Sequence, residues 1–245
     1  DIDRLEPDQI RVLLRQVKAN ANLPNIVFVL LFQPSIVERA LDPVADGNGR
    51  AFLEKIVQAS FDLPAVPTHM VHQIFGEQLS QLAGRYATEQ NGFSDVRWGN
   101  GLIGCIQPRL RNMRDAHRLL SSMAVHLPLH ASGDLFEVNL VDFLILETLR
   151  VFEADLYEAL FQEKSLLLQE GRYRGDGRMA AVQEATNRLL EIVPKERRKL
   201  AQDTIKALFP PLEWALGGTH YGDGFRQNWL AGKQVCTARF FPRYF

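Results

Sequence analysis

Seven consecutive apolar residues at positions 26–32, Ile-Val-Phe-Val-Leu-Leu-Phe, constrain the fold of this chain more than any other stretch. The run follows a Pro-Asn turn and holds no polar residue, which predicts a strand buried on both faces. Such strands occur in parallel sheets whose two faces are covered by helices. An amphipathic stretch with an apolar stripe from Ile10 to Val17 precedes the run and predicts one covering helix. We therefore expect the chain to begin with an α/β fold.

Three further stretches extend this predicted α/β part. Residues 33–41 and 50–57 carry apolar residues at helical spacing, and each predicts a short helix. Residues 59–63 alternate between apolar and polar side chains, as a strand does, and Pro64 and Pro67 then end the pattern. We place the end of the α/β part at residue 67.

The rest of the chain has helical spacing almost throughout. The predicted helices cover about residues 71–83, 113–127, 139–150, 153–169, 179–193 and 195–208. From residue 209 the chain is rich in Gly, Pro and aromatic residues, which predicts an irregular packed segment. The expected fold class is thus α/β followed by mostly α, with an α/β core over 1–67, a helical part over 68–208 and an aromatic-rich segment over 209–245.

Composition narrows the possible functions. The 245 residues carry a net charge of -1, so no general attraction to nucleic acid or to an anionic membrane is implied. Cys105 and Cys236 form no C-x-x-C pair, which argues against zinc and against a disulfide-stapled secreted fold. No apolar run approaches the roughly 18 to 20 residues that a membrane span requires. The cytoplasm is the simplest setting.

Acidic and amide side chains stand where a parallel sheet would bind a ligand. Asp1 and Asp3 open the chain with the character of a strand's carboxyl end, and their carboxylates suit Mg²⁺ and an attacking water. Gln33 follows the predicted strand, so its amide could hold a γ-phosphate or that water. The alternatives are a pair of surface carboxylates and a residue that merely starts a helix.

Basic side chains form a second candidate group. Arg111, Arg114 and Arg118 share one face of a predicted helix and could reach a triphosphate and stabilise its transition-state charge. A solvated helix face is the alternative. Arg50 and Lys55 could likewise present a cation to a neighbouring subunit, and an ordinary surface role is the alternative there.

Other motifs carry little weight. Gly99 to Gly104 matches G-x-G-x-x-G, but no strand precedes it, and no G-x-x-x-x-G-K-[ST] phosphate loop occurs in the sequence. Ser121 and Ser122 lack the setting of a catalytic nucleophile. Basic and aromatic residues alternate after Phe225 and could bind single-stranded nucleic acid, although packing at the end of a fold is the alternative.

In combination, these segments resemble the KAP family of P-loop NTPases. Asp1-Ile-Asp-Arg-Leu5 is similar to the end of that family's acidic Walker B strand, without the strand and its first aspartate. Residues 50–58 and 61–64 are similar to the Phe-Leu-Glu-Lys-Ile segment before the last core strand. Residues 112–120 resemble the lid helix that usually reads Pro-Arg-Asp-Val-Lys-Arg-Phe, and residues 138–152 resemble the leucine-rich helix that follows.

The resemblance implies the last part of a P-loop NTPase parallel-sheet core that hydrolyses ATP with Mg²⁺, followed by a helical lid. Asp1 would be the second Walker B acid, near the metal and polarising the water, with Asp3 and Arg4 beside it. Gln33 would fill the sensor position, where the family commonly has Asp.

The same resemblance assigns the basic residues. Arg114 and Arg118 would be lid arginines that bind the nucleotide, and Lys55 would lie near the place where related ATPases present a cation in trans. We expect the Walker A loop and the leading Walker B aspartate upstream, together with the membrane-spanning insertions of some members, and we expect this chain to be inactive alone.

Two functions remain open at this point. The first is an ATPase whose cycle drives assembly of a homo-oligomer, in bacterial antiviral defence and acting on an effector protein. The second is a non-catalytic scaffold or sensor that binds a protein or nucleic-acid partner. A phosphate loop upstream would favour the first.

Overall fold

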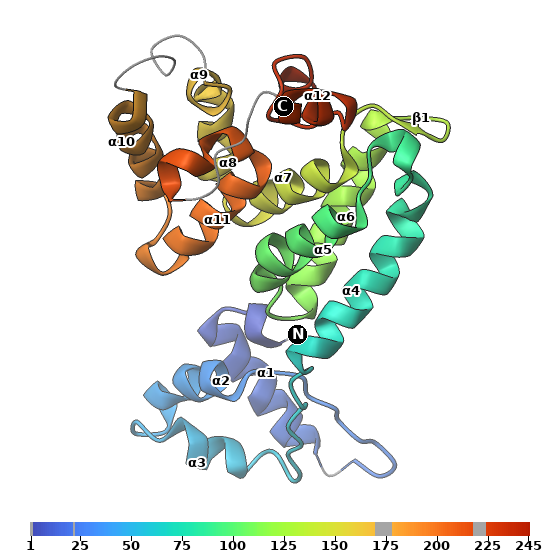
Figure 1. Ribbon diagram of the computed structural model, residues 1–245. Coiled ribbons are helices and arrows are strands. Elements are labelled where there is room, and N and C mark those ends of the chain that lie inside the picture. Colours follow the sequence, from blue (N-terminus) through green and yellow to red (C-terminus); the bar gives the residue numbers. More distant parts are fainter. Residues whose placement is uncertain (1, 22, 170–177, 218–223) are drawn as a thin grey trace. The chain divides into compact units, whose positions relative to one another are not determined.

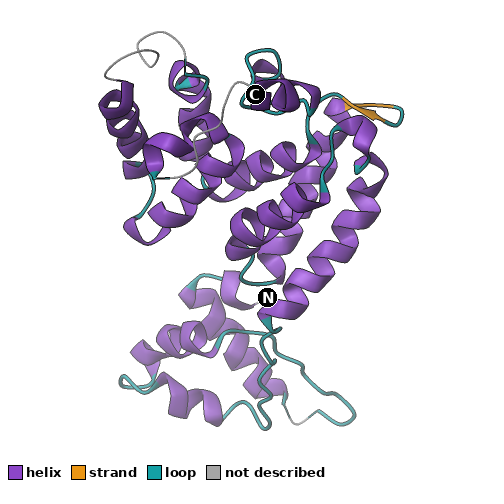
Figure 2. Ribbon diagram, viewed as in Figure 1, coloured by secondary structure: helices purple, strands orange, loops and turns teal. Residues whose placement is uncertain are grey.

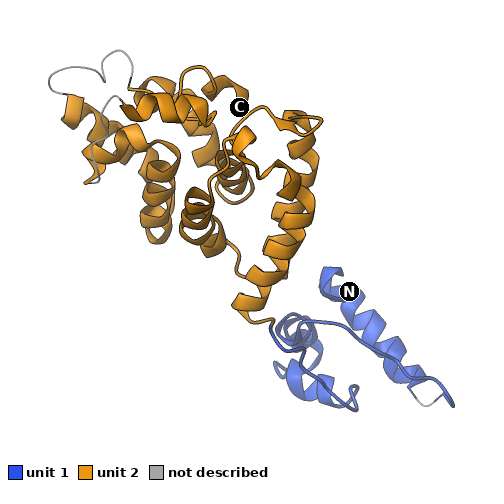
Figure 3. Ribbon diagram, turned by 45° about the vertical axis from the view of Figure 1, so that its right-hand side comes forward, with its two compact units in different colours: residues 1–65 blue, residues 66–245 orange. Residues whose placement is uncertain are grey.

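The computed structural model describes residues 2–21, 23–169, 178–217 and 224–245, and these are mostly helical (Figures 1 and 2). The chain divides into two compact units, unit 1 from Asp1 to Ala65 and unit 2 from Val66 to Phe245 (Figure 3). Within the described ranges the strands are β1 (Ala131–Ser132) and β2 (Leu135–Phe136), which pair antiparallel.

Unit 1 consists of short helices that share one apolar core. Its elements are the 3-10 turn η1 (Ile2–Arg4), helices α1 (Pro7–Asn20), α2 (Pro34–Leu41) and α3 (Gly49–Glu54), and the 3-10 turn η2 (Asp42–Val44). The buried apolar residues are Ile2, Ile10, Leu14, Val17, Val37, Ala40, Leu41, Leu53 and Ile56. The helices predicted before and after the apolar run are therefore confirmed, because their apolar stripes pack against one another.

Close packing of α2 and α3 depends on one glycine. Asn48 caps α3 by accepting a hydrogen bond from Ala51 N at 3.1 Å. Gly49 then passes so near α2 that an added Cβ would lie 2.0 Å from the carbonyl oxygen of Glu38. Gly49 N also donates to Asp42 Oδ1 at 2.9 Å, so both the missing side chain and the backbone donor fix the α2–α3 turn.

The predicted parallel sheet is not formed by the described residues. Residues 26–32 are extended but are not assigned as a strand, and Val27 and Val29 are 86% and 80% exposed. Residues 59–66 are likewise unassigned, and Phe61 and Leu63 are 89% and 85% exposed. A strand is made by hydrogen bonds to neighbouring strands, and apolar patterning alone cannot supply those neighbours. The strand predictions were therefore wrong for this structure.

Unit 2 is a helical assembly that also includes the aromatic-rich end of the chain. Its described α-helices are α4 (Thr68–Ala83), α5 (Asp95–Gly101), α6 (Met113–His126), α7 (Leu140–Phe152), α8 (Ala154–Gln162), α9 (Lys164–Leu167), α10 (Arg178–Glu191), α11 (Arg198–Leu208) and α12 (Gly224–Ala231). A π-helix, Leu102–Ile106, continues α5, so the G-x-G-x-x-G sequence lies in helix and not after a strand.

Helix α7 is the centre of unit 2. Residues 140–149 are all buried, and α6 and α8 pack beside it (Figure 1). Asn139 caps its start by accepting hydrogen bonds from Val141 N and Asp142 N. A helix that is apolar on nearly every side must be enclosed by others, which explains why the remaining helices gather around it.

The last residues are tied to α7 by buried polar groups. Asp142, fully buried, forms an ion pair with Arg97 and accepts a hydrogen bond from Val235 N at 2.9 Å. The Tyr244 hydroxyl accepts from Asn139 N at 2.8 Å. Burial raises the pKa of the Asp142 carboxyl, while the nearby Arg97 opposes that rise. The described part of the aromatic-rich segment is thus packed, as its composition predicted, but it is not irregular throughout, because it forms the 3-10 helix η10 (Pro210–Leu216) and helix α12.

Candidate functional site

Asp3 and Gln33, two candidate residues of unit 1, lie together. Asp3, in η1, accepts a hydrogen bond from Gln33 N, with Asp3 Oδ1 at 2.7 Å from the nitrogen. The next bond along, from Ile2 N to Leu31 O at 3.3 Å, holds η1 against the end of the extended segment 26–32. The structure thus places Asp3 at the carboxyl end of that segment. Asp1 lies outside the described residues.

Gln33 has two roles where η1 meets the start of α2, a place here called the Asp3–Gln33 corner. Its carbonyl oxygen accepts from Ile36 N at 3.0 Å, so the residue starts α2, which is the simpler of the two interpretations of the sequence. Its side chain is exposed and makes no cap hydrogen bond to α2. The side-chain amide is therefore not used in capping α2, and the second oxygen of Asp3 makes no hydrogen bond to a described residue.

This corner offers ligands of the type that Mg²⁺ prefers. The Asp3 carboxylate and the Gln33 side-chain carbonyl are both oxygen donors. Among the described residues there is no group of three or more His, Cys, Asp or Glu that could hold a metal ion. Mg²⁺ bound with a nucleotide takes one or two carboxylates and completes its shell with phosphate and water, so the donor set fits that case.

Arg50 and Lys55, two basic residues predicted for unit 1, take no part in this hydrogen bond. Arg4 is exposed at the end of η1. Lys55 is exposed at the carboxyl end of α3, and no hydrogen bond or ion pair joins it to Asp3 or Gln33 in the structure. Arg50 pairs across one turn of α3 with Glu54, Nε to Oε1 at 3.4 Å, and both side chains are well exposed.

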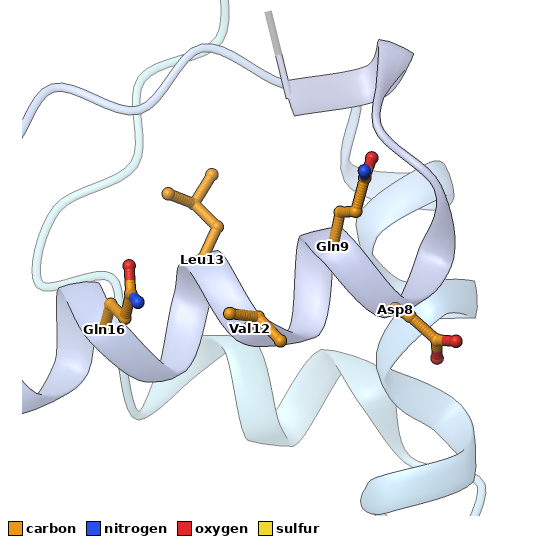
Figure 4. A pocket seen from close by; sticks show the side chains of 5 residues that line it. All are labelled: Asp8, Gln9, Val12, Leu13 and Gln16. Carbon is orange, nitrogen blue, oxygen red and sulfur yellow. The ribbon is translucent and has the colours of Figure 1, made fainter.

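A shallow pocket of about 300 Å³ also lies on unit 1, along α1 (Figure 4). It is lined by Asp8, Gln9, Val12, Leu13 and Gln16. Figure 4 shows Gln9, Leu13 and Gln16 on the same side of the helix. The lining contains no cationic side chain, so this pocket lacks the charge that a phosphate ligand requires.

The predicted arginines of unit 2 line a groove between α6 and α7, here called the α6–α7 groove. Its volume is about 710 Å³. The lining residues are Arg114, His117, Arg118, Ser121, Ser122, Arg150 and Val151. Arg114 and Arg118 are therefore brought together as their helical spacing predicted, whereas Arg111, on the same predicted face, does not line the groove.

Two of these arginines are held in place. Arg118 Nη2 donates to Val151 O at 3.2 Å, and its guanidinium lies 5.6 Å from the centre of the Phe152 ring. Arg150 Nη2 donates to the Tyr157 hydroxyl at 2.7 Å. The guanidinium groups thus stand at one edge of α7 in fixed positions, and each still has N–H donors that these contacts do not use.

A buried carboxylate, that of Glu147, contacts residues of both helices that form the groove. Glu147 is 3% exposed. One of its oxygens accepts hydrogen bonds from the Ser122 hydroxyl and from His126 Nδ1, the latter at 2.7 Å, and the other lies 3.4 Å from Arg150 Nη1. This network ties α6 to α7. The sequence interpretation missed Glu147 and Arg150; the available signal was a Glu and an Arg three residues apart within a leucine-rich helix.

The candidate residues therefore form two groups. Asp3 and Gln33 meet in unit 1, and Arg114 and Arg118 meet in unit 2. None of the helices in the described residues is long and apolar enough to cross a membrane.

The order of these groups along the chain is that of a known family. The model of the KAP family P-loop domain matches residues 1–130. The chain belongs to the KAP family. The match takes in all of unit 1 and continues through α6 of unit 2, so it includes Asp3, Gln33, Arg114 and Arg118. Glu147 and Arg150 lie beyond it.

One curated relative has a printed role. The phage T7 exclusion protein of Escherichia coli (strain K12) is 26% identical to this KAP-family chain over 195 residues. The aligned region covers 78% of this chain but 26% of that protein, so the chain spans about a quarter of the relative's length. No solved structure matches the chain.

Proposed function

We propose that this chain is part of an ATP-hydrolysing KAP-type P-loop NTPase that acts in defence against phage. The observation that carries the proposal is the hydrogen bond from Gln33 N to Asp3, which sets a carboxylate at the end of an extended apolar segment. In parallel α/β sheets that edge is where ligands bind. The family match and the name of the relative support the nucleotide and the phage context respectively.

The proposed roles follow from charge and position. Asp1 and Asp3 supply carboxylates that would hold Mg²⁺ and accept a proton from the attacking water, and Gln33 orients that water through its amide. Arg114 and Arg118 neutralise phosphate charge, which is the main form of catalysis available in phosphoryl transfer. Lys55 is exposed, so in a cytoplasmic homo-oligomer it would present its positive charge to the nucleotide of a neighbouring subunit.

The exposed apolar segments fit the same proposal. Residues 26–32 and 59–66 have no strand partners among the described residues, and several of their apolar side chains, such as Val27, Val29 and Phe61, are exposed. Central strands of a parallel sheet have this composition, and they are stable only when neighbours and helices cover them. We propose that both segments are sheet strands of the intact protein.

The test is ATP turnover by the intact protein with Asp1→Asn. Loss of a carboxylate that activates water costs about 100-fold or more in rate, while the isosteric amide should leave folding unchanged. Asp203→Asn is the matched control, because Asp203 is half exposed in a surface pair with Lys199 at 2.9 Å. Turnover within twofold of the unsubstituted protein would refute the assignment. An intact protein that binds ATP without turnover would favour the scaffold or sensor instead.

A further inference from the structure

We propose that the α6–α7 groove is a binding site for the oligophosphate chain of a nucleotide, and that Arg150 binds it together with Arg114 and Arg118. The choice of a nucleotide as the ligand rests on the proposed function. The site itself rests on the groove, two of whose seven lining residues, Arg150 and Val151, come from α7 and lie beyond residue 130, outside the family match.

The chemistry of the lining selects for anions. Three of the seven lining residues are arginines, and none is a carboxylate. Arginine presents planar N–H donors that match phosphate oxygens in pairs. The hydroxyl of Ser121, exposed on α6, adds a donor in the same groove. The groove is open and has a volume of about 710 Å³, which is enough room for a short chain of phosphates.

Two of the three arginines are held in position by other residues of the chain. Contacts with Val151 O and the Phe152 ring hold Arg118, and the Tyr157 hydroxyl holds Arg150. The guanidinium of Arg114 makes no hydrogen bond or ion pair with any residue that the structure describes, so it can turn toward a ligand. Groups that are already held lose less conformational entropy on binding, which favours affinity.

Glu147 explains how three guanidinium groups can share one groove. Like charges repel, and the buried carboxylate of Glu147 offsets part of that repulsion through Arg150, 3.4 Å away. Because Glu147 is 3% exposed and is already engaged by Ser122 and His126, it does not compete for the ligand's side of the groove. Glu147 is thus a positioning residue for Arg150.

An oligophosphate fits this groove better than a nucleic-acid strand. Sites for single strands combine cations with large aromatic faces on which bases stack, and no lining residue of the groove is Phe, Tyr or Trp. A duplex would need a long basic surface, whereas the chain as a whole has a net charge of -1. The compact cluster of arginines matches a short chain of phosphates.

The experiment is a calorimetric titration of the 245-residue chain with sodium tripolyphosphate at low ionic strength. Arg114→Gln and Arg150→Gln should each weaken binding by about 10- to 100-fold, the effect of losing a charge-assisted hydrogen bond. Arg188→Gln is the matched control, because Arg188 is 53% exposed on α10 and outside the groove. It should bind as the unsubstituted chain does.

A second variant protects the test from a folding defect, since Arg150 also contacts Tyr157 and Glu147. Ser121→Glu adds a negative charge to the groove at an exposed position and should abolish binding without changing the thermal midpoint. Equal affinity in Arg114→Gln, Arg150→Gln and Arg188→Gln would overturn the proposal. Tighter binding of a single-stranded oligonucleotide than of tripolyphosphate, lost with the same substitutions, would overturn the choice of ligand.

Failure here and failure of the proposed function are distinguishable. If Asp1→Asn abolishes turnover in the intact protein while the groove substitutions leave tripolyphosphate binding unchanged, the groove proposal falls and the ATPase proposal stands. If the groove substitutions abolish tripolyphosphate binding while Asp1→Asn retains turnover, the phosphate site stands and the assigned ATPase chemistry falls.

Discussion

The ion pair between Arg109 and Glu153 should be among the largest single contributions to the conformational specificity of unit 2, and its removal should be costly. The two side chains are 2% and 5% exposed, and Arg109 Nη2 lies 2.6 Å from Glu153 Oε2. Arg109 Nη1 also donates to Cys105 O at 2.5 Å and to Thr204 Oγ1 at 3.1 Å. The guanidinium therefore joins the π-helix, α11 and the start of α8.

The expected magnitude follows from burial. Glu153→Gln removes the negative charge and leaves a buried guanidinium without its counterion, which costs about 3–5 kcal/mol. Arg197, whose Nη1 lies 3.9 Å from Glu153 Oε1, is a second cation beside the same carboxylate. It therefore cannot replace the negative charge that Arg109 loses. A loss of this size is a large part of the roughly 5–15 kcal/mol that stabilises a typical domain. Replacing both residues by apolar ones, Arg109→Met with Glu153→Leu, should recover most of it.

Urea unfolding followed by tryptophan fluorescence measures this change in unit 2 alone. Trp98, Trp214 and Trp229 all lie in unit 2, so unit 1 contributes no tryptophan signal. Glu137→Gln is the control, because Glu137 is 51% exposed in a 3.7 Å pair with Arg243 and should change stability by less than about 1 kcal/mol. A Glu153→Gln protein within 1 kcal/mol of the unsubstituted chain, or a double variant no better than the single one, would refute the reasoning.

Other parts of the fold should respond as their contacts dictate. Asn139→Ala removes the cap of α7 and should cost unit 2 about 1–3 kcal/mol in the same urea assay; an unchanged midpoint would contradict this. Gly49→Ala places a Cβ 2.0 Å from Glu38 O, so α2 and α3 must separate, and limited proteolysis should cut unit 1 faster. Burial raises the pKa of the Cys236 thiol and of the Tyr244 hydroxyl above their unfolded values, so the stability that each neutral form provides is present below its unfolded pKa, about 8.5 for Cys and about 10 for Tyr, and is lost as pH rises further. The urea midpoint of unit 2 should therefore fall between about pH 8.5 and pH 10 as unfolded chains ionise Cys236, and a flat profile over this range would argue against burial of that thiol.

Helices could be predicted from this sequence because their determinants are local. The apolar stripe from Ile10 to Val17 packs as its spacing predicted, and Asn139 caps α7 with its own side chain. Both features depend on residues within a few turns of one another. Strands depend on distant partners, and this is why residues 26–32 were assigned a structure that the described residues do not form.

The candidate site shows the same division between local and distant information. Arg114 and Arg118 could be placed on one face from a spacing of four residues, and the groove contains both. Asp3 and Gln33 were expected to lie close together at the ends of neighbouring strands. They do lie close together, although no sheet is formed by the described residues, because Gln33 N donates a hydrogen bond to Asp3 Oδ1 at 2.7 Å. Glu147 and Arg150 could not be assigned, because their role depends on Ser122 and His126 of another helix.

The two units differ in how completely they bury their apolar side chains and pair their buried charges, and this difference bears on function. Unit 2 buries a continuous core around α7 and pairs its buried charges, such as Arg97 with Asp142. Unit 1 leaves Val27 and Phe61 86% and 89% exposed. An exposed apolar surface of this kind marks a place where other structure packs. Arg114 and Arg118, the arginines proposed to bind phosphate, therefore lie on the unit with the continuous core, while Asp3 and Gln33 lie on the unit whose exposed segments we propose to be strands of a larger sheet.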